Sequence, residues 1–481
     1  MAEKMLQFTH VQRSMPAKRA PDARAHDFDE IYSEFSLKAA GAQAARCSQC
    51  GVPFCQQGCP LSNNIPDWLK LAAEGRLEEA WEVSTATNNM PEICGRICPQ
   101  DRLCEGICTI EQSGHGTVTI GSVEKFITDT AWDEGWVKPI SPPRERAQSA
   151  GIIGAGPGGL AAAEQLRRKG YQVTVYDAYD RGGGLLVYGI PGFKLEKPVV
   201  ARRIKHLEDS GVTFRFNTRI GPDISLQDLR KAHDTVLIAT GVYQAKDLKC
   251  PGVGSTGVLA ALDFLTASNR KSFGDAVPEF DDGTLNAEGK RVVVIGGGDT
   301  AMDCVRTAVR QGAKSVTCLY RRDRANMPGS QREVANAEEE GVVFEWLASP
   351  EAILDTKAGK AKAVRAAKMK LGEPDASGRQ SPVKTGDTMD VKADMVIKAL
   401  GFDPEDLPEL FGEPALTVNR WGAVRVDYAT METSLSGVYA AGDIVRGASL
   451  VVWAIKDGRD AAEAMHRAMK SAEKASKVAA E

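Results

Sequence analysis

Long apolar runs are missing from this sequence of 481 residues. Nowhere does it contain about 18 consecutive apolar residues, the length that a membrane-spanning helix needs. The first residues include an acid and lack the apolar segment of a secretory signal. From these absences we expect a cytoplasmic protein that does not bind membranes.

A large excess of charge of one sign is also missing. The formal net charge is −4, and no long basic run occurs. Nucleic acids and anionic membrane surfaces attract strongly basic proteins, so neither is an expected partner.

A set of side chains for nucleophilic or acid–base catalysis is missing as well. His115 and His233 stand alone in the sequence, and we interpret both as structural. Cys250, Cys304 and Cys318 are isolated from one another and read as inert thiols. We therefore predict no catalytic side chain, and we expect bound cofactors to supply the chemistry.

Cysteine, in contrast, is abundant near the N-terminus. Of 11 cysteines, eight lie between residues 47 and 108, in two runs separated by a predicted helix over residues 65–83. In a long chain without a secretory signal, such crowding favours metal ligation over disulfides. The predicted metal ligands are Cys47, Cys50, Cys55, Cys59, Cys94, Cys98, Cys104 and Cys108.

The spacing in the first run favours iron–sulfur clusters. The pattern C-x2-C-x4-C-x3-C-P resembles the ferredoxin pattern C-x2-C-x2-C-x3-C-P, and eight thiolates suit two 4Fe-4S clusters. In ferredoxins the fourth cysteine binds the other cluster, so Cys59 is predicted to join the second run while Cys47, Cys50 and Cys55 share a cluster. Structural zinc sites are the alternative, but zinc motifs favour C-x2-C pairs, and only Cys47 and Cys50 form one.

The rest of the chain is organised around a glycine-rich turn. Gly154, Gly156 and Gly159 form G-x-G-x-x-G between a predicted strand and helix, and Asp177 ends the next strand. In a dinucleotide-binding βαβ unit, these glycines allow a tight turn, close approach of a pyrophosphate and close helix packing, while the acid binds a ribose. The pattern predicts a site for an ADP moiety. A glycine-dense loop that includes Gly184 follows, suited to lie against a flat ligand.

A second fingerprint predicts a second dinucleotide site. Gly296, Gly298 and Ala301 have the spacing G-x-G-x-x-A after a strand. The following strand ends with Arg321 and Arg322 in place of an acid, and arginines there suit the 2′-phosphate of NADP.

These patterns predict an α/β protein in which the second dinucleotide-binding domain is inserted in the first. Residues 1–147 form a helical, cysteine-rich iron–sulfur domain that begins with an extended arm over residues 1–35. A proline-rich linker ends it. Residues 148–285 and 425–481 form one Rossmann-like domain, and residues 286–424 form the other.

Both fingerprints resemble those of the two-dinucleotide-binding-domain flavoproteins, the superfamily of glutathione and thioredoxin reductases. The resemblance implies FAD at the first fingerprint and the nicotinamide cofactor, here NADPH, at the second. It also implies that Thr240 and Gly241 close a flavin-domain strand and that Gly442 and Asp443 lie at the flavin ribityl and phosphates. The redox disulfide of that superfamily is absent, so electrons must leave the flavin by another route.

Over the full chain, the sequence resembles the small-subunit family of bacterial NADPH-dependent glutamate synthases. The likeness implies a relay from NADPH through FAD and the clusters to a large subunit that makes glutamate from glutamine and 2-oxoglutarate, in a hetero-oligomer. The alternatives are another acceptor, such as a ferredoxin or a pyrimidine or sulfur reductase, or a scaffold without turnover. The N-terminal part also resembles dihydropyrimidine dehydrogenase, which implies that Glu124 competes with Cys94 for the last ligand position.

Overall fold

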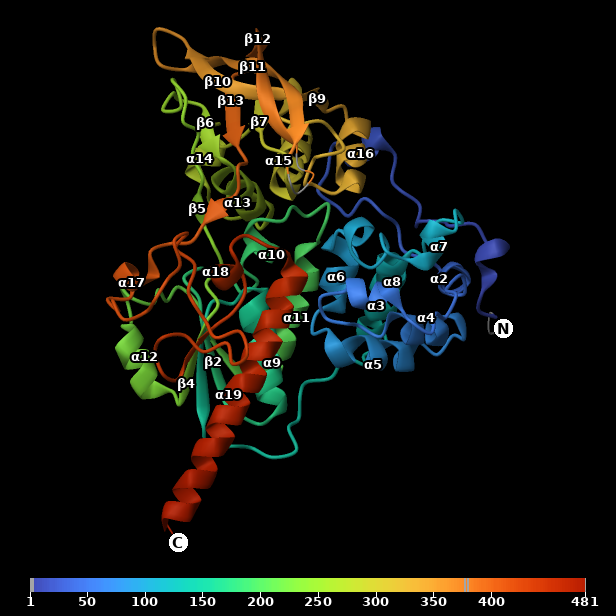
Figure 1. The fold of residues 1–481 in the computed structure, drawn as a ribbon, viewed down its shortest axis with the longest axis vertical. Coiled ribbons are helices and arrows are strands. Elements are labelled where there is room, and N and C mark those ends of the chain that lie inside the picture. The colour runs from blue at the N-terminus through green and yellow to red at the C-terminus, as the bar shows by residue number, and fades with distance from the viewer. Residues whose placement is uncertain (1–3, 376–377, 379, 481) are drawn as a thin grey trace.

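The computed structural model describes residues 4–375, 378 and 380–480, and it shows three parts (Figure 1). The N-terminal part is helical, and the fully buried Trp68 lies at its centre, donating a hydrogen bond from Nε1 to Asn63 Oδ1 at 2.8 Å. Its elements are η1 (Gln7–Thr9), α1 (Pro21–Arg24), α2 (Leu37–Ala44), α3 (Phe54–Gly58), α4 (Ile65–Ala73), α5 (Leu77–Thr87), α6 (Pro91–Ile97), η2 (Gln100–Arg102), α7 (Thr109–Gln112) and α8 (Ile120–Asp133).

The single helix predicted over residues 65–83 is instead two helices, α4 and α5. Gly75 lies between them with φ +78°, a left-handed conformation that ends a helix. Pro66 lies in the first turn of α4, where its missing N–H costs nothing. The break lets the two helices fold against each other between the cysteine runs.

The second part is a five-stranded parallel sheet with the strand order β15-β4-β1-β2-β3. Ile152 and Ile153 are adjacent in β1, lie in different apolar clusters and are both buried, as expected for a strand that is covered on both faces. The strands are β1 (Ser149–Ile153), β2 (Gln172–Tyr176), β3 (Val212–Arg215), β4 (Thr235–Ile238) and β15 (Val438–Ala440). The helices are α9 (Pro157–Arg168), α10 (Leu185–Tyr188), α11 (Lys197–Asp209), α12 (Leu226–Ala232), α17 (Leu407–Leu410), α18 (Asp443–Arg446) and α19 (Val451–Ala480).

The third part repeats this design with the parallel order β6-β13-β7-β8-β9. Val294 packs with the helices on one face, and Val293 packs with an antiparallel sheet, β10-β11-β12, on the other. The parallel strands are β6 (Val258–Ala260), β7 (Arg291–Ile295), β8 (Ser315–Tyr320), β9 (Val343–Trp346) and β13 (Met395–Lys398). The other elements are α13 (Ala261–Ser272), α14 (Pro278–Asp281), α15 (Asp299–Arg310), α16 (Gln331–Glu339), β10 (Ala348–Asp355), β11 (Ala361–Pro374) and β12 (Gln380–Lys392).

The third part is inserted in the second, which confirms the predicted architecture. The chain passes between the two at β5 (Gln244–Ala245) and β14 (Phe402–Asp403), which pair antiparallel. Strand β6 already belongs to the third part, although the boundary predicted from the sequence lies at residue 285. Leu407 and Leu416 already pack in the core of the second part, although the predicted return lies at residue 425. The boundaries differ because a segment without a fingerprint or a long strand has no sequence pattern that shows which core it joins.

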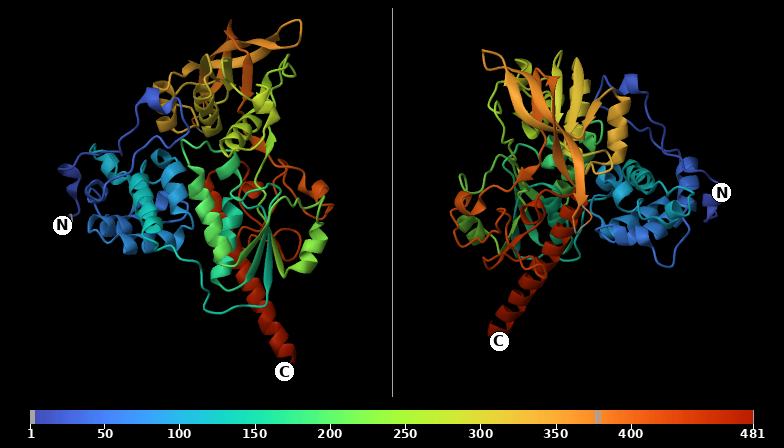
Figure 2. Two further views of the ribbon diagram at one scale, coloured as in Figure 1. Left: turned by 180° about the vertical axis from the view of Figure 1, so that it is seen from behind. Right: turned by 45° about the horizontal axis from the view of Figure 1, so that its top comes forward.

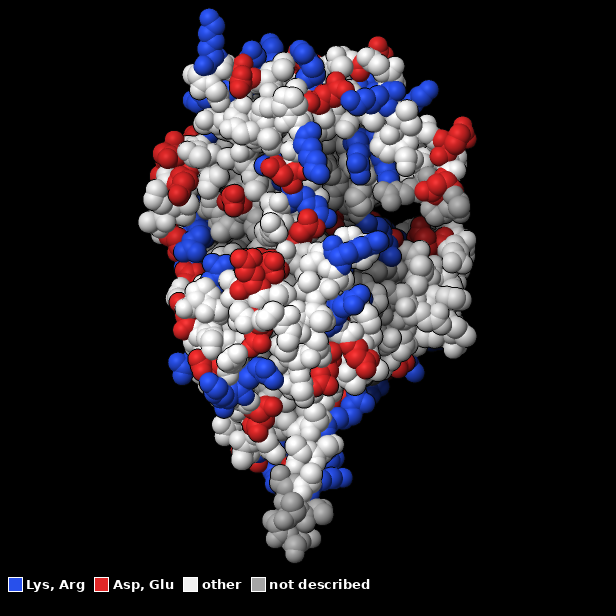
Figure 3. All heavy atoms as spheres, turned by 60° about the vertical axis from the view of Figure 1, so that its left-hand side comes forward, with Lys and Arg blue, Asp and Glu red and all other residues white. Residues whose placement is uncertain are grey.

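The N-terminal arm lies against the third part, as Figure 2 shows from two further sides. Lys18 Nζ lies 2.7 Å from Glu339, and Arg24 Nε lies 2.9 Å from Glu340, where both side chains are fully buried. The arm therefore ties the helical part to the inserted one. Lysine, arginine and acidic side chains are interspersed over the face in Figure 3. Within the described residues, no helix is long and apolar enough to cross a membrane.

Candidate functional site

The first fingerprint forms the turn from β1 to α9. Gly154 has φ +107°, and a Cβ there would lie 2.3 Å from Ala239 O. A Cβ on Gly159 would lie 1.9 Å from Gly154 O, so two of the three glycines are required by the fold itself. A Cβ on Gly156 would meet nothing within 4 Å. That open space, at the N-terminus of α9, is where a pyrophosphate would lie close to the backbone.

Asp177 follows β2 and holds the turn in place. Its carboxylate accepts hydrogen bonds from Ala155 N at 2.7 Å and Tyr179 N at 2.8 Å, while burial raises its pKa. Asp177, Gly154 and Thr240 line one cavity of about 340 Å³. Thr240 Oγ1 is buried there without a hydrogen-bond partner. An unpaired buried hydroxyl beside an open turn fits a polar cofactor.

A second cavity, of about 230 Å³, lies where all three parts of the molecule meet. The first fingerprint contributes Gly156, the inserted part contributes Asp299 and Thr300, and the helical part contributes Cys98 and Pro99. The fold therefore builds this cavity from both fingerprints and a predicted cluster ligand.

The remaining predicted flavin residues surround these two cavities. Gly184 has φ +53°, and a Cβ there would lie 3.1 Å from Gly156 Cα, so the glycine-dense loop packs on the fingerprint. Gly241 and Asp443 line the second cavity, and Gly442 precedes Asp443 at the start of α18 with φ +79°. Burial raises the pKa of Asp443 to about 6.

Tyr243, which no sequence motif marks, lines both cavities. Its ring lies 6.0 Å from the Tyr179 ring, and burial raises its pKa above the usual range. Lys194 and Asp303 also line the second cavity and were missed. Asp303 could have been found from the sequence, because it lies two residues after Ala301 of the second fingerprint. No sequence pattern marks Lys194 or Tyr243.

The second fingerprint repeats the geometry of the first. Gly296 has φ +153°, and a Cβ there would lie 2.2 Å from Ala399 O, while a Cβ on Gly298 would meet nothing within 4 Å. Ala301 is buried in α15. The loop after β8 covers this turn, since Gly329 N donates to Gly297 O at 2.9 Å and Ser330 N donates to Asp299 Oδ1 at 3.0 Å.

Arg321 and Arg322 follow β8 beside this fingerprint. Arg321 is exposed, and Arg322 is half-buried, with its Nε buried and without a hydrogen-bond partner. A guanidinium with an unused donor fits an anionic group such as a phosphate.

The eight clustered cysteines fall into two neighbouring groups. Burial, together with the charges of the neighbouring Cys108 and Cys50, raises the pKa of Cys47 to about 11 and that of Cys55 to about 12. These four thiols form the outer quartet, which comprises Cys47, Cys50, Cys55 and Cys108.

The other four thiols form the inner quartet. The pKa of Cys98 is raised, and although its hydrogen bond to Cys94 lowers it, burial and the charges of Glu124, Cys104 and Cys59 prevail. Burial raises the pKa of Cys104, and the charge of Cys55 in the outer quartet also raises it, so the two groups are adjacent. The inner quartet comprises Cys59, Cys94, Cys98 and Cys104, and Cys59 therefore lies with the second run. All eight thiols are free.

Glu124 lies beside the inner quartet, on α8. It is buried, and burial raises its pKa to about 8. Asn88 joins the two candidates for the last ligand position: its Nδ2 donates to Glu124 Oε1 at 3.3 Å, and Cys94 Sγ donates to its Oδ1 at 3.8 Å. Among the described residues, no group of three His, Cys, Asp or Glu side chains is arranged to hold a single metal ion.

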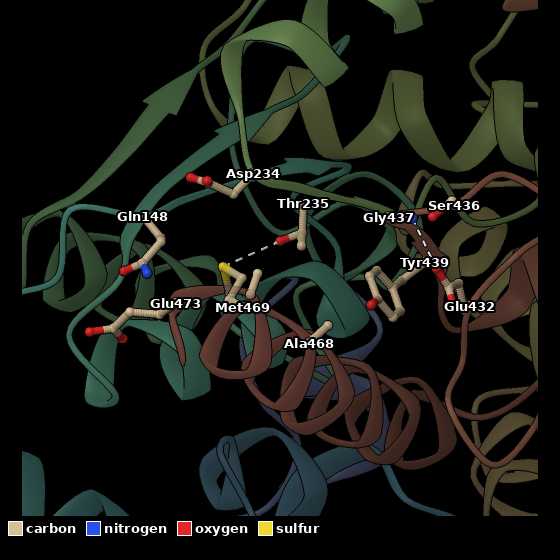
Figure 4. Close-up of a pocket in the computed structure, with 11 residues that line it drawn as sticks. Gln148, Asp234, Thr235, Glu432, Ser436, Gly437, Tyr439, Ala468, Met469 and Glu473 are labelled. Carbon is tan, nitrogen blue, oxygen red and sulfur yellow. Dashed lines mark hydrogen bonds between the residues drawn. The ribbon is translucent and has the colours of Figure 1, made fainter. Parts of the chain in front are cut away.

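A larger cavity, of about 560 Å³, lies at the opposite end of the first sheet, beside α19 (Figure 4). Its acids already have partners: Asp234 accepts from Ser149 N at 2.7 Å, Glu432 accepts from Gly437 N at 2.9 Å, and Glu473 pairs with Arg146 at 3.1 Å. Parallel sheets bind cofactors beyond the carboxyl ends of their strands, and this cavity lies at the amino ends.

Two family descriptions match the chain in the same order as the folded parts. Residues 24–136 match "Dihydropyrimidine dehydrogenase domain II, 4Fe-4S cluster", and residues 149–458 match "Pyridine nucleotide-disulphide oxidoreductase". Among solved structures, Mycobacterium tuberculosis FprA in complex with NADPH aligns with a TM-score of 0.58 at 21% identity, covering 69% of this chain and 86% of that one. At that identity, the likeness supports the fold alone.

Curated relatives are much more similar in sequence. The glutamate synthase NADPH small chain of Azospirillum brasilense is 65% identical over 481 residues, covering 100% of this chain and 99% of that one. The same small chain of Escherichia coli K12 is 46% identical over 467 residues, covering 96% and 98%. The putative oxidoreductase AegA of Escherichia coli K12 is 45% identical, and the match covers 94% of this chain but 69% of that protein.

Fold, fingerprints and family matches define a pyridine nucleotide-dependent flavoprotein oxidoreductase with an N-terminal iron–sulfur domain. Within that class, the chain belongs to the glutamate synthase NADPH small-chain family. The membership confirms the resemblance and the fold class predicted from the sequence.

Proposed function

We propose that this chain oxidises NADPH and passes the electrons to a glutamate synthase large subunit, which forms glutamate from glutamine and 2-oxoglutarate. The observation that carries the proposal is the cavity of about 230 Å³, which brings Gly156, Thr300 and Cys98 to one place. A hydride passes from nicotinamide to flavin only when the two are in contact, and the cluster that takes single electrons must lie close by. This cavity is where the three corresponding elements meet.

The two fingerprints bind different cofactors. Gly154, Gly156, Gly159 and Asp177 hold the ADP half of FAD, while a second set lies along its ribityl and ring: Gly184, Thr240, Gly241, Gly442 and Asp443. The second fingerprint holds the pyrophosphate of NADPH with Gly296, Gly298 and Ala301, and Arg321 and Arg322 bind its 2′-phosphate. Each helix N-terminus at these turns directs backbone N–H groups at the phosphates.

The outer quartet is assigned one 4Fe-4S cluster, and Cys59, Cys98 and Cys104 hold a second one whose last ligand is either Cys94 or Glu124. The pKa values of Cys47 and Cys55, about 11 and 12, mean that both thiols are neutral at physiological pH until a metal binds and displaces their protons. Bound FAD accepts a hydride and releases electrons singly, which is the conversion that these clusters need.

The protein's own contribution is positioning rather than acid–base chemistry. Thr300 and Asp299 bring the N-terminus of α15 to the cavity that Gly156 also lines, so the nicotinamide and flavin sites adjoin this cavity. Cys98 and Pro99 close the same cavity on the side of the helical part. No side chain is assigned a proton-transfer role.

A partner that carries the glutamine chemistry follows from the family. The small-chain relatives are named as one chain of a larger enzyme, and we propose a hetero-oligomer with the large chain. Eleven thiols without a disulfide suit a reducing compartment, and we propose a cytoplasmic location.

The test is to mix the purified, cluster-containing chain with a glutamate synthase large chain and to follow NADPH oxidation. We expect oxidation that depends on both glutamine and 2-oxoglutarate and yields glutamate. Oxidation that is independent of both compounds, together with rapid reduction of a ferredoxin, would instead assign the chain to another acceptor.

A further inference from the structure

The loop that covers the second fingerprint is held from outside by the helical part. We call this loop, residues 321–330 between β8 and α16, the covering loop. Ser330 Oγ donates to the Asp101 carboxylate, at 3.2 Å from Oδ1 and 3.4 Å from Oδ2, and an Arg102 Nη1 donor bonds to Pro328 O. We call Asp101 and Arg102 together the loop anchor.

The same end of the covering loop lies directly on the nucleotide turn. Ser330 is buried, and its backbone N donates to Asp299 Oδ1 at 3.0 Å, while Gly329 N donates to Gly297 O at 2.9 Å. A Cβ on Gly329 would lie 3.2 Å from Gly297 O, so the two backbones are closely packed. The space beside Gly298 stays open. Ser330 therefore connects the loop anchor on one side with the first residue of α15 on the other.

The loop anchor belongs to a well-supported segment of the helical part. It lies in η2, between the predicted cluster ligands Cys98 and Cys104. The buried Gln100 side chain in the same short helix donates from Nε2 to Cys94 O and Gly95 O, both at 3.1 Å. These bonds tie η2 to α6, so the loop anchor is a fixed point for the covering loop.

Helix α16, which follows the covering loop, is held by the helical part at its other end as well. Lys18 Nζ of the arm donates to Asn336 Oδ1 at 3.2 Å. Arg24 Nη2 donates to Glu339 Oε2 at 2.5 Å, and its Nε lies 2.9 Å from Glu340 Oε1. The covering loop and α16 are thus attached to the helical part at both ends, although they belong to the inserted part.

We propose that Asp101 and Arg102 are positioning residues for the nucleotide, so that the helical iron–sulfur part contributes to the affinity for NADPH. Both act through Pro328 and Ser330 rather than on the nucleotide itself. A loop that is ordered before the nucleotide arrives loses less conformational entropy on binding, which strengthens binding. This inference rests on the proposed NADPH site at the second fingerprint.

The test uses the holoprotein with Asp101→Ala, Arg102→Ala and Ser330→Ala introduced singly, and with Asp101→Ala and Ser330→Ala combined. Asp133→Ala is the control, since Asp133 is an exposed acid at the end of α8 in the same helical part. We measure the dissociation constant of NADP⁺ from its effect on flavin absorption, and the KM and kcat for NADPH with a small dye as acceptor. Flavin and iron content are measured for each variant.

For each single variant of these three residues, we expect the dissociation constant of NADP⁺ and the KM for NADPH to rise about fivefold. The kcat, the flavin content and the iron content should stay as in the wild type, and Asp133→Ala should bind NADP⁺ normally. Because Asp101 and Ser330 share one hydrogen bond, the double variant should bind NADP⁺ no more weakly than either single one.

If the wild-type chain binds NADP⁺ and both anchor variants bind it as tightly, the loop anchor does not position the nucleotide. Increases that multiply in the double variant would also contradict the proposal, because they would show that the two side chains act independently. A wild-type chain that fails to bind NADP⁺ would overturn the proposed nucleotide site, and this inference with it.

Discussion

The Lys194 ammonium lies 2.8 Å from the Asp303 carboxylate and joins the two dinucleotide-binding parts across the cavity that they share. Both side chains are nearly buried, with exposures of 12% and 8%. Lys194 precedes α11 of the first part, and Asp303 lies on α15 of the inserted part. The pair is therefore a buried contact that ties the two dinucleotide-binding parts together.

Replacement of Lys194 by Met should destabilise the protein, because the Asp303 carboxylate would remain buried without its partner. Loss of one member of a buried pair costs about 3 to 5 kcal/mol. Thermal unfolding of the holoprotein should show a lower midpoint, and NADPH-driven flavin reduction should slow. The double variant Lys194→Met with Asp303→Leu should recover much of the midpoint. A double variant as unstable as the single one would contradict this account.

Alanine at Gly156 and alanine at Gly298 make a matched pair of cofactor tests. A Cβ at either position meets no protein atom within 4 Å, so both variants should fold. We expect Gly156→Ala to lose FAD, measured by flavin absorbance, because the methyl occupies the pyrophosphate space. Gly298→Ala should keep FAD and lose NADPH affinity. Full flavin content in folded Gly156→Ala would move the FAD site elsewhere.

Neutralising Arg321 and Arg322 should reduce the preference for NADPH. Each charge-assisted contact to the 2′-phosphate contributes about 1.5 to 3 kcal/mol, or roughly tenfold to hundredfold in affinity. Steady-state kinetics should show the KM for NADPH rising by at least that factor while the KM for NADH changes little. Equal increases for both nucleotides would show that these arginines do not read the phosphate.

Glu124, rather than Cys94, is expected to complete the cluster of the inner quartet. Within the described residues no cation pairs with this buried carboxylate, and an iron atom would supply the missing positive charge. Asn88 bonds to both Glu124 and Cys94, so its hydrogen bonds do not favour either one. Glu124→Ala should lose one of the two cluster signals, and Cys94→Ser should retain both. The reverse result assigns the ligand to Cys94.

The Thr109 hydroxyl should raise the reduction potential of the outer cluster. Its Oγ1 lies 3.2 Å from Cys50 Sγ, and a hydrogen bond to a ligand sulfur favours the more negative, reduced state. Thr109→Val should lower the potential by about 20 to 60 mV in a redox titration followed by electron paramagnetic resonance. Thr85→Val, whose hydroxyl bonds only to backbone oxygens, serves as the control. An unchanged potential in Thr109→Val would exclude this hydrogen bond.

Motifs of fixed spacing could be predicted from the sequence, because the backbone geometry at these positions limits which residues can occupy them. Gly154 and Gly159 must be glycine, since a Cβ at either position would lie 2.3 Å or less from a backbone oxygen. Such a requirement is visible in the sequence as a conspicuous glycine spacing. The helix break at Gly75 was missed, because one glycine in an apolar helical pattern is a weak signal. The places where the chain changes parts, near residues 245 and 403, were also not readable, because short strands carry no period.

The sequence by itself determined the class of this protein: two nucleotide fingerprints and eight clustered cysteines specify its cofactors through local backbone and ligand geometry. Only the tertiary structure decided which elements meet. Lys194 and Asp303, or Cys98 and Gly156, lie far apart in the chain and are brought together where the three parts pack against one another, which no local pattern records.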